Sequence, residues 1–135
     1  IESIQKLWKG CGAHTSLMSP YQHDEMLAMT SHLPHILAFT FMNHMLSNST
    51  EKNEDTLLNF AGSGFRDFTR IASSSPEMWK DICLANRRLL LQQIRVYQNE
   101  LARMNEILED GDGAALEKFF LNAQITRGKF LKDKH

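Results

Sequence analysis

The chain has 135 residues, a formal net charge of −1, 42% hydrophobic residues and 23% charged residues. This length allows one domain, and the composition is that of an ordinary globular protein. A net charge near zero argues against a surface built to bind nucleic acid or an anionic membrane. The most apolar stretch, 33–46, is too short and too polar to cross a bilayer, and no signal-peptide pattern opens the chain. Cys11 and Cys83 form no spaced motif, so reduced thiols in a cytoplasmic protein are predicted.

The first eighteen residues predict a short helix followed by a strand. The helix covers 1–9 and ends at the glycine-rich turn 10–12, because glycine ends helices at little cost. A strand is predicted over 14–18. A lone strand has no hydrogen-bonding partner, so we interpret it as an edge strand of a sheet that lies upstream. Because the first residue is Ile rather than Met, we expect the chain to be a piece of a longer protein.

The next helix is predicted over 21–46. Ser19 is a favourable N-cap and Pro20 fits the first helical position. Pro34 lies inside this helix and cannot bond to the carbonyl of Thr30, so a kink is predicted near Thr30. A polar loop then leads to a short helix at 56–61.

The second half of the chain predicts further helices around one long central helix. Glycines at 62 and 64 separate helix 56–61 from a helix at 65–72. Ser75 and Pro76 then mark the start of a helix predicted to run over 76–110, and a last helix follows at 114–126.

These elements predict an all-α bundle of about five helices. A helix of about 35 residues is about 50 Å long, whereas a compact domain of this size is about 30 Å across. The excess apolar surface needs a partner, and an intertwined symmetric homodimer is therefore predicted.

Two histidines beside the predicted kink form the first candidate site. His32 and His35 are neighbours on one helix face, and Ser31 lies on the same side. A zinc ion would need a third protein ligand, and no HExxH or CxxC is present, so no metal site is predicted. Anion recognition and a purely structural role both remain open. His23, nine residues before His32, falls on the opposite face of a regular helix.

A second candidate site follows the glycine pair. Arg70 lies three residues after Asp67, which allows either an ordinary surface ion pair or a guanidinium fork that binds a carboxylate in bidentate fashion. Gly62-Ser63-Gly64 follows no strand and lacks a third glycine, so it is not a dinucleotide fingerprint. Trp79 either packs in the core or forms the wall of a ligand site.

Four segments together resemble the C-terminal half of prephenate dehydrogenases: 23–28, 30–35, 64–73 and 76–82. The resemblance covers Trp8 to about Leu101. In that family an N-terminal Rossmann domain holds NAD or NADP, and a helical C-terminal domain dimerises and completes the substrate pocket. The resemblance therefore implies that 1–18 is the tail end of a dinucleotide-binding domain and that 19–135 is the helical dimerisation and substrate-binding domain.

The resemblance also implies roles for individual residues. Arg70 would clamp a carboxylate of prephenate, and Asp67 and Trp79 would lie at the pocket edge, reached from the dimer partner. His23 and Asp24 match the motif but are expected to face away from the pocket. The full set of implied substrate-binding residues is Ser31, His32, His35, Ser63, Gly64, Asp67, Arg70 and Trp79.

The implied activity is the oxidative decarboxylation of prephenate to 4-hydroxyphenylpyruvate in tyrosine biosynthesis. The cofactor loop and the catalytic histidine are expected in an N-terminal domain outside this chain. We therefore expect the 135 residues alone to be inactive and to bind no nicotinamide. The expected partners are a second copy, the Rossmann domain and a further enzyme domain fused after the C-terminus. An arogenate dehydrogenase and a non-catalytic helical dimerisation module remain alternatives.

Overall fold

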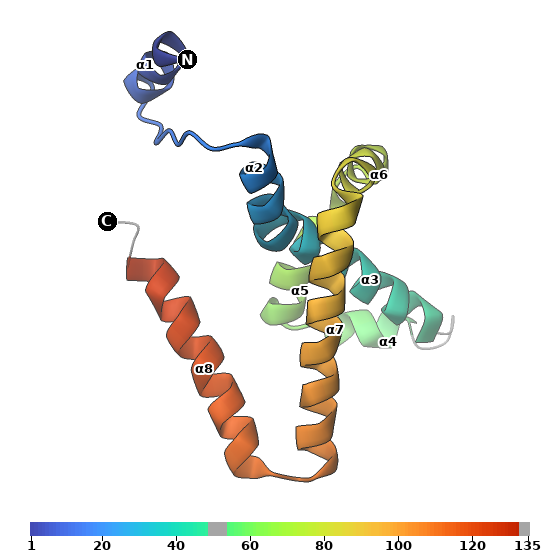
Figure 1. Ribbon diagram of the computed structural model, residues 1–135. Coiled ribbons are helices and arrows are strands. Elements are labelled where there is room, and N and C mark those ends of the chain that lie inside the picture. The colour runs from blue at the N-terminus through green and yellow to red at the C-terminus, as the bar shows by residue number, and fades with distance from the viewer. Residues whose placement is uncertain (49–53, 133–135) are drawn as a thin grey trace. The chain divides into compact units, whose positions relative to one another are not determined.

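The computed structural model describes residues 1–48 and 54–132, which fold into helices joined by short connections (Figure 1). The α-helices are α1 (Glu2–Gly10), α2 (Pro20–Leu27), α3 (Leu33–Asn48), α4 (Glu54–Asn59), α5 (Ser63–Thr69), α6 (Pro76–Ala85), α7 (Arg87–Glu109) and α8 (Gly113–Lys132). A π-helical turn, η1 (Ala28–His32), joins α2 to α3, and a 3₁₀ turn, η2 (Arg70–Ser73), follows α5. The predicted all-α fold class is confirmed.

The predicted N-terminal strand is wrong. Residues 13–19 form an irregular connection, and none of the described residues is in a strand. A strand needs a neighbour to complete its hydrogen-bond ladder, and the described part of the chain offers none. The helix before it ends as expected: Gly12 has a positive φ of 80°, and its N–H donates to the carbonyl of Lys9 at 2.9 Å.

The helix predicted over 21–46 is divided by the π-helical turn η1. Its start is a capping box, in which Gln22 N–H donates to Ser19 Oγ at 3.2 Å and Ser19 N–H donates to Gln22 Oε1 at 2.9 Å. The irregularity lies where the kink was predicted, around Thr30. Pro34 has no N–H to offer the Thr30 carbonyl, and a π turn re-pairs the neighbouring groups with a wider spacing.

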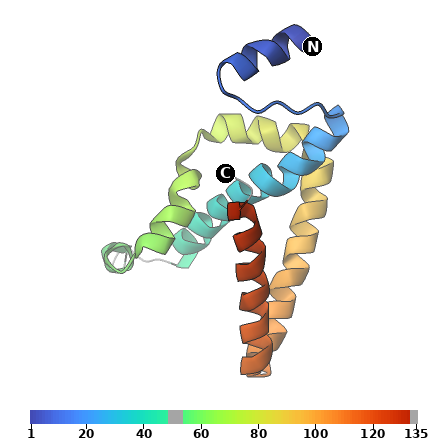
Figure 2. The ribbon, with the colours of Figure 1, turned by 90° about the vertical axis from the view of Figure 1, so that its left-hand side faces the viewer.

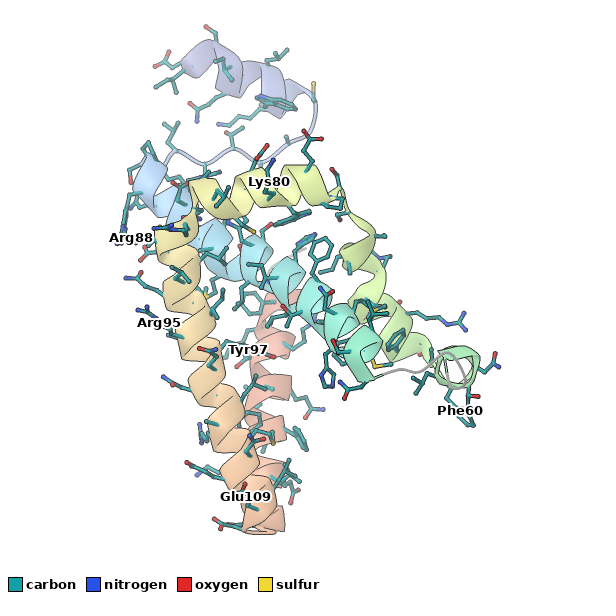
Figure 3. All side chains as sticks on the ribbon, turned by 90° about the vertical axis from the view of Figure 1, so that its right-hand side faces the viewer. Phe60, Lys80, Arg88, Arg95, Tyr97 and Glu109 are labelled. Carbon is teal, nitrogen blue, oxygen red and sulfur yellow. The ribbon has the colours of Figure 1, made fainter. Side chains whose placement is uncertain are left out.

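The helix predicted over 76–110 is broken at Asn86, which has φ −104° and ψ 25°. Helical hydrogen bonds continue on both sides, because Asn86 N–H donates to Ile82 and the Asn86 carbonyl accepts from Leu90. The chain changes direction between them, as Lys80 on α6 and Arg88 on α7 show (Figure 3). With 23 residues, α7 is about 35 Å long. Helix length alone therefore no longer argues for a dimer.

The chain divides into two compact units, 1–91 and 92–135. In the first, α3 packs against η1, α5 and η2 (Figure 2). Phe41 of α3 meets Phe65 and Phe68 of α5, with ring centroids 5.9 and 5.7 Å apart. The core of this unit is small. Its buried apolar residues are Ala28, Leu33, Ala38, Trp79, Leu89 and Leu90.

The second unit is a helical hairpin made of α7 from residue 92 onward and α8. The turn uses Gly111 at φ 64°, and Asp112 caps α8 by accepting from the N–H groups of Ala114 and Ala115 at 3.0 Å each. Arg103 lies 5.7 Å from the ring centre of Phe119. In the described ranges, no helix combines the length and apolarity that spanning a membrane requires.

Candidate functional site

The candidate site centres on a cluster of three rings, His32, His35 and Trp79, which we call the ring cluster. Trp79 of α6 is 7% exposed and stacks on His35, with ring centroids 3.9 Å apart and an interplanar angle of 22°. The same indole meets His32 edge-on at 6.0 Å and 80°. Trp79 thus contacts both histidines of its own chain. Sequence reasoning had assigned all three residues to one site but had placed Trp79 on the dimer partner.

His32 is buried in surroundings that favour its neutral form. It is 8% exposed, and its Nδ1 lies 3.2 Å from Asn86 Nδ2. Burial lowers the pKa of His32 from its ordinary value of 6.5, and the Asp24 carboxylate offsets this only in part. His32 therefore contributes an uncharged ring, which can donate a hydrogen bond but does not supply a positive charge.

His35 is half-buried and bonded to the turn that precedes it. Its Nδ1 lies 2.9 Å from the backbone carbonyl oxygen of Ser31. A carbonyl oxygen only accepts, so Nδ1 carries the proton and donates it. The other ring nitrogen, Nε2, then serves as an acceptor when His35 is neutral.

A cavity of about 410 Å³ opens beside the ring cluster. Its polar lining includes Ser31, His32, Trp79 and Asn86, together with His23 and Asp24. The last two were expected to face away from this place, and that expectation is wrong. Nine residues of regular α-helix leave about half a turn between His23 and His32. The wider π turn changes that phase and returns both to one side.

Trp79, which lines this cavity, has a buried indole N–H, at Nε1, without a hydrogen-bond partner among the described residues. A buried polar group without a partner costs free energy, so such groups are rare and point to a missing water or ligand. The indole N–H is therefore an unsatisfied donor on a residue that lines the cavity.

The second predicted group of residues lies on α5 and η2 rather than in this cavity. Arg70 is exposed on η2, which packs against α3. The alternative of an Asp67–Arg70 ion pair finds no support among the described residues, whose ion pairs involve other groups. Ser63 and Gly64 open α5 and are both exposed. A Cβ added at Gly64 would meet nothing within 4 Å, so crowding in this chain does not require glycine there.

Asn86 is the residue that sequence reasoning missed. It is 7% exposed and joins two elements far apart in the chain, by bonds to His32 and to the Asp24 carbonyl. One signal was available in the sequence: Asn86 occupies an apolar register position of the predicted long helix, in line with Ile82 and Leu90. A polar residue at such a position conflicts with core packing and marks a special role.

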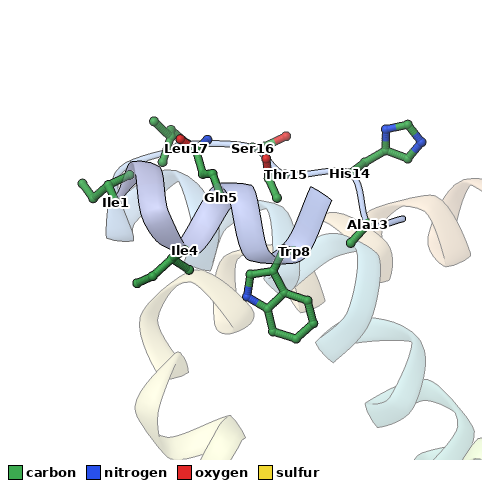
Figure 4. A pocket seen from close by; sticks show the side chains of 9 residues that line it. All are labelled: Ile1, Ile4, Gln5, Trp8, Ala13, His14, Thr15, Ser16 and Leu17. Carbon is green, nitrogen blue, oxygen red and sulfur yellow. The ribbon is translucent and has the colours of Figure 1, made fainter. Parts of the chain in front are cut away.

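A second cavity, of about 530 Å³, lies between α1 and the irregular segment that follows it (Figure 4). Ile4 and Trp8 from α1 and Leu17 from the irregular segment give it a largely apolar lining. None of the predicted site residues contributes to it. The glycines before α5 follow no strand, so they are not a dinucleotide-binding loop of the Rossmann type.

Residues 19–122 match the family model described as prephenate dehydrogenase, dimerization domain. The chain belongs to this prephenate dehydrogenase family. The predicted resemblance is thereby confirmed. The matched range contains the ring cluster, Asn86, Arg70, all of α7 and the first half of α8.

Two curated relatives place this prephenate dehydrogenase domain within longer proteins. It is 36% identical over 127 residues to the prephenate dehydrogenase of Bacillus subtilis, covering 94% of this chain and 34% of the relative. It is 34% identical over 127 residues to the cyclohexadienyl dehydrogenase of Zymomonas mobilis, covering 94% of this chain and 43% of that one. The chain thus spans well under half the length of these relatives.

Solved structures share the same arrangement of helices. The prephenate dehydrogenase of Aquifex aeolicus, determined with hydroxyphenyl propionate and NAD+, superposes with a TM-score of 0.87 at 31% identity. The match covers 96% of this prephenate dehydrogenase domain and 44% of that chain. Synechocystis arogenate dehydrogenase has a TM-score of 0.84 at 22% identity, which shows a shared fold.

Proposed function

We propose that this chain is the dimerisation and substrate-binding part of an NAD(P)-dependent prephenate dehydrogenase. Such an enzyme oxidises prephenate and releases carbon dioxide to give 4-hydroxyphenylpyruvate. The family match supports the class of enzyme. The observation that carries the proposal is the ring cluster, of which His32 and Trp79 line a cavity of about 410 Å³ together with Ser31 and Asn86. Cavities of about 300–1,000 Å³ are typical for small ligands.

The chemistry of the lining suits an oxygen-rich acid. The Ser31 hydroxyl and the His32 ring belong to residues that line the cavity and can act as donors, and carboxylate or keto oxygens are acceptors. A neutral His32 can donate a hydrogen bond, and no positive charge then has to be buried. His35 does not line this cavity; it stacks on Trp79, and in this proposal its Nε2 accepts a hydrogen bond from a substrate hydroxyl.

Arg70 supplies the positive charge in this proposal. Its guanidinium is exposed on η2, next to the helix that carries His35. A guanidinium binds a carboxylate through two parallel hydrogen bonds, which lysine cannot provide. We assign Arg70 to a prephenate carboxylate, and Asp67, Ser63 and Gly64 to substrate contacts made from α5, outside the cavity described above.

The hydride acceptor and the catalytic base belong to another domain in this proposal. The glycines before α5 are not a Rossmann-type loop, and no cofactor step is assigned to this chain. Formation of an aromatic ring drives the reaction, and the protein mainly orients the substrate and binds its charges. This chain performs those two tasks.

A homodimer is the proposed assembly. Large apolar side chains of α7 and α8 are exposed, among them Leu101, Leu108, Phe120 and Ile125, each at least half exposed. An exposed apolar surface of this kind typically marks an interface. The family description, which names dimerization, supports a second copy as the partner.

A chimera tests the proposal. Residues 19–122 of this chain replace the corresponding segment of the Bacillus subtilis relative, and reduction of NAD is followed with prephenate and, in parallel, with arogenate. We expect turnover of prephenate by the chimera and none by the 135 residues alone. A folded, dimeric chimera that turns over neither substrate would contradict the proposal, and a preference for arogenate would redirect it to that substrate.

A further inference from the structure

Asn86, at the junction of α6 and α7, hydrogen-bonds to α2 and to the turn that carries His32. Its side chain is 7% exposed and makes two contacts through one atom. Asn86 Nδ2 lies 2.7 Å from the Asp24 carbonyl oxygen and 3.2 Å from His32 Nδ1. These contacts span 62 and 54 positions of the sequence.

The first contact fixes which way the amide points. The two ends of an asparagine amide look alike, so their assignment depends on their partners. The Asp24 carbonyl oxygen can only accept a hydrogen bond, so the atom 2.7 Å from it must be the NH₂ group. The reversed amide would place two acceptor oxygens together in a buried site.

The second contact then fixes the proton on His32. The remaining hydrogen of the Asn86 NH₂ group points to His32 Nδ1, which must therefore be unprotonated and accept it. In a neutral imidazole the proton then sits on Nε2. His35 is held the opposite way, since its Nδ1 donates to the Ser31 carbonyl. Two histidines three residues apart thus present different chemistry, a donor on His32 and an acceptor on His35.

We infer that Asn86 is a positioning residue of the substrate site, which holds His32 as the neutral Nε2–H tautomer so that His32 donates a hydrogen bond to the bound acid. The inference rests on the proposed function for the identity of that acid. Asn86 does not itself need to contact substrate. It acts through His32, as outer-shell partners of histidine commonly do.

An exposed pair in the same chain provides a matched comparison. Asn48 Nδ2 lies 2.8 Å from the His44 carbonyl oxygen and 3.2 Å from His44 Nδ1, nearly the same geometry. Both residues are exposed near the end of α3, where water competes for every one of these groups. Burial is what distinguishes the Asn86 pair, because a buried group has no water to exchange with.

The tautomer is measured directly on the full chain without substrate. Isotope-labelled histidine and long-range proton–nitrogen NMR correlations show which ring nitrogen carries the proton, and His32→Gln identifies the His32 signals by their loss. We expect His32 protonated on Nε2 and His35 protonated on Nδ1 at neutral pH. A His32 ring protonated on Nδ1 would overturn the inference.

The variant Asn86→Asp tests the cause. Its carboxylate only accepts, so His32 is expected to take up a proton on Nδ1, whereas Asn48→Asp should leave the His32 and His35 signals in place. An unchanged His32 spectrum in folded Asn86→Asp would count against Asn86 as the cause. If Asn86→Asp does not fold, the spectrum of the unmodified chain still decides the tautomer.

Kinetics of the chimera test the consequence. His32→Asn keeps an acceptor toward Asn86 but loses the donor at the ring tip, whereas His32→Gln keeps an N–H near that tip. We expect KM for prephenate to rise roughly tenfold or more in His32→Asn and clearly less in His32→Gln. Equal effects would overturn the assigned role. A chimera without any activity would count against the proposed function, whereas the tautomer measurement needs no substrate.

Discussion

Trp79 contacts two histidines that differ in burial, in hydrogen-bond partner and in the ring nitrogen that carries the proton. Its stacking on His35 and its edge contact with His32 place all three rings within one small volume. Its own N–H remains without an acceptor in the described part of the chain. At the scale of single residues, ring packing therefore holds the hydrogen-bonding groups of His32, His35 and Trp79 close together.

Replacing Trp79 should separate packing from hydrogen bonding. Trp79→Phe keeps a stacking ring and removes a donor that has no acceptor among the described residues, so the free energy of unfolding should fall by only about 1–2 kcal/mol. Trp79→Ala should cost about 3–5 kcal/mol. Urea denaturation of the full chain measures both, and equal losses would show that the indole N–H has a structural partner.

Stability should depend on the protonation of His32. Because its folded-state pKa is lowered, the unfolded chain binds a proton at a higher pH than the native chain does. Stability is then complete above the ordinary pKa of 6.5 and declines as pH falls from there through the lower folded-state pKa. Urea midpoints between about pH 5 and about pH 7.5 measure this decline. His32→Gln should flatten the decline, and His44→Gln, at an exposed position, serves as the control.

Arg70 should affect binding far more than folding. Arg70→Ala removes an exposed side chain with no ion pair in the described residues, so the free energy of unfolding should change by about 0.5 kcal/mol at most. In the chimera KM for prephenate should rise strongly, on the order of a hundredfold, because a carboxylate loses its charged partner. Arg70→Lys should rescue little. An unchanged KM, as expected for Arg66→Ala, would mean that Arg70 does not bind substrate.

At the scale of elements, two irregularities place the site. The π turn η1 rotates α2 so that His23 and Asp24 reach the same cavity as Ser31 and His32. The break at Asn86 separates α6 from α7, and α6 carries Trp79, which packs against His32 and His35. Helical hydrogen bonds are kept before and after both irregularities, so the change of direction costs little hydrogen-bond energy.

The N-cap of α2 should contribute measurably to stability. Ser19→Ala removes the acceptor for Gln22 N–H and opens the capping box, which should lower the free energy of unfolding by about 1 kcal/mol. Ser16→Ala, in the irregular segment before it, should have little effect. Urea denaturation compares the two, and an equal loss would show that the cap is not formed in solution.

At the scale of the whole molecule, apolar surface exceeds what one copy covers. Leu108 on α7 and Phe120 on α8 are 58% and 57% exposed. Surfaces of this kind on amphipathic helices usually pack against another chain.

Charge introduced on these helices should therefore weaken the dimer. Leu108→Glu and Phe120→Glu should shift the mass in sedimentation experiments from dimer toward monomer, because a buried unpaired charge is costly. Lys118→Glu changes the charge of α8 without removing apolar area and serves as the control. A monomeric mass for the unmodified chain would contradict a homodimer.

Local chemistry made several features predictable. Ser19-Pro20 and Ser75-Pro76 start helices through caps that lie within one turn, and Pro34 marks the irregular turn because its missing N–H is a property of one residue. The rings of His32, His35 and Trp79 were assigned to one site through their motifs. The predicted strand over 14–18 failed because strand formation depends on a neighbour, which short segments cannot reveal.

The sequence by itself determined the all-α class, the helix starts and the family, since these follow from local hydrogen bonding and from motif order. Only the tertiary structure decided that Asn86 breaks the long helix and bonds to His32, and that His23 and Asp24 turn toward the cavity. The direction of His23 and Asp24 depends on the π turn η1, which rotates α2 relative to a regular helix. The Asn86 contacts join residues more than fifty positions apart in the sequence. Contacts of that range determine which nitrogen of His32 carries its proton.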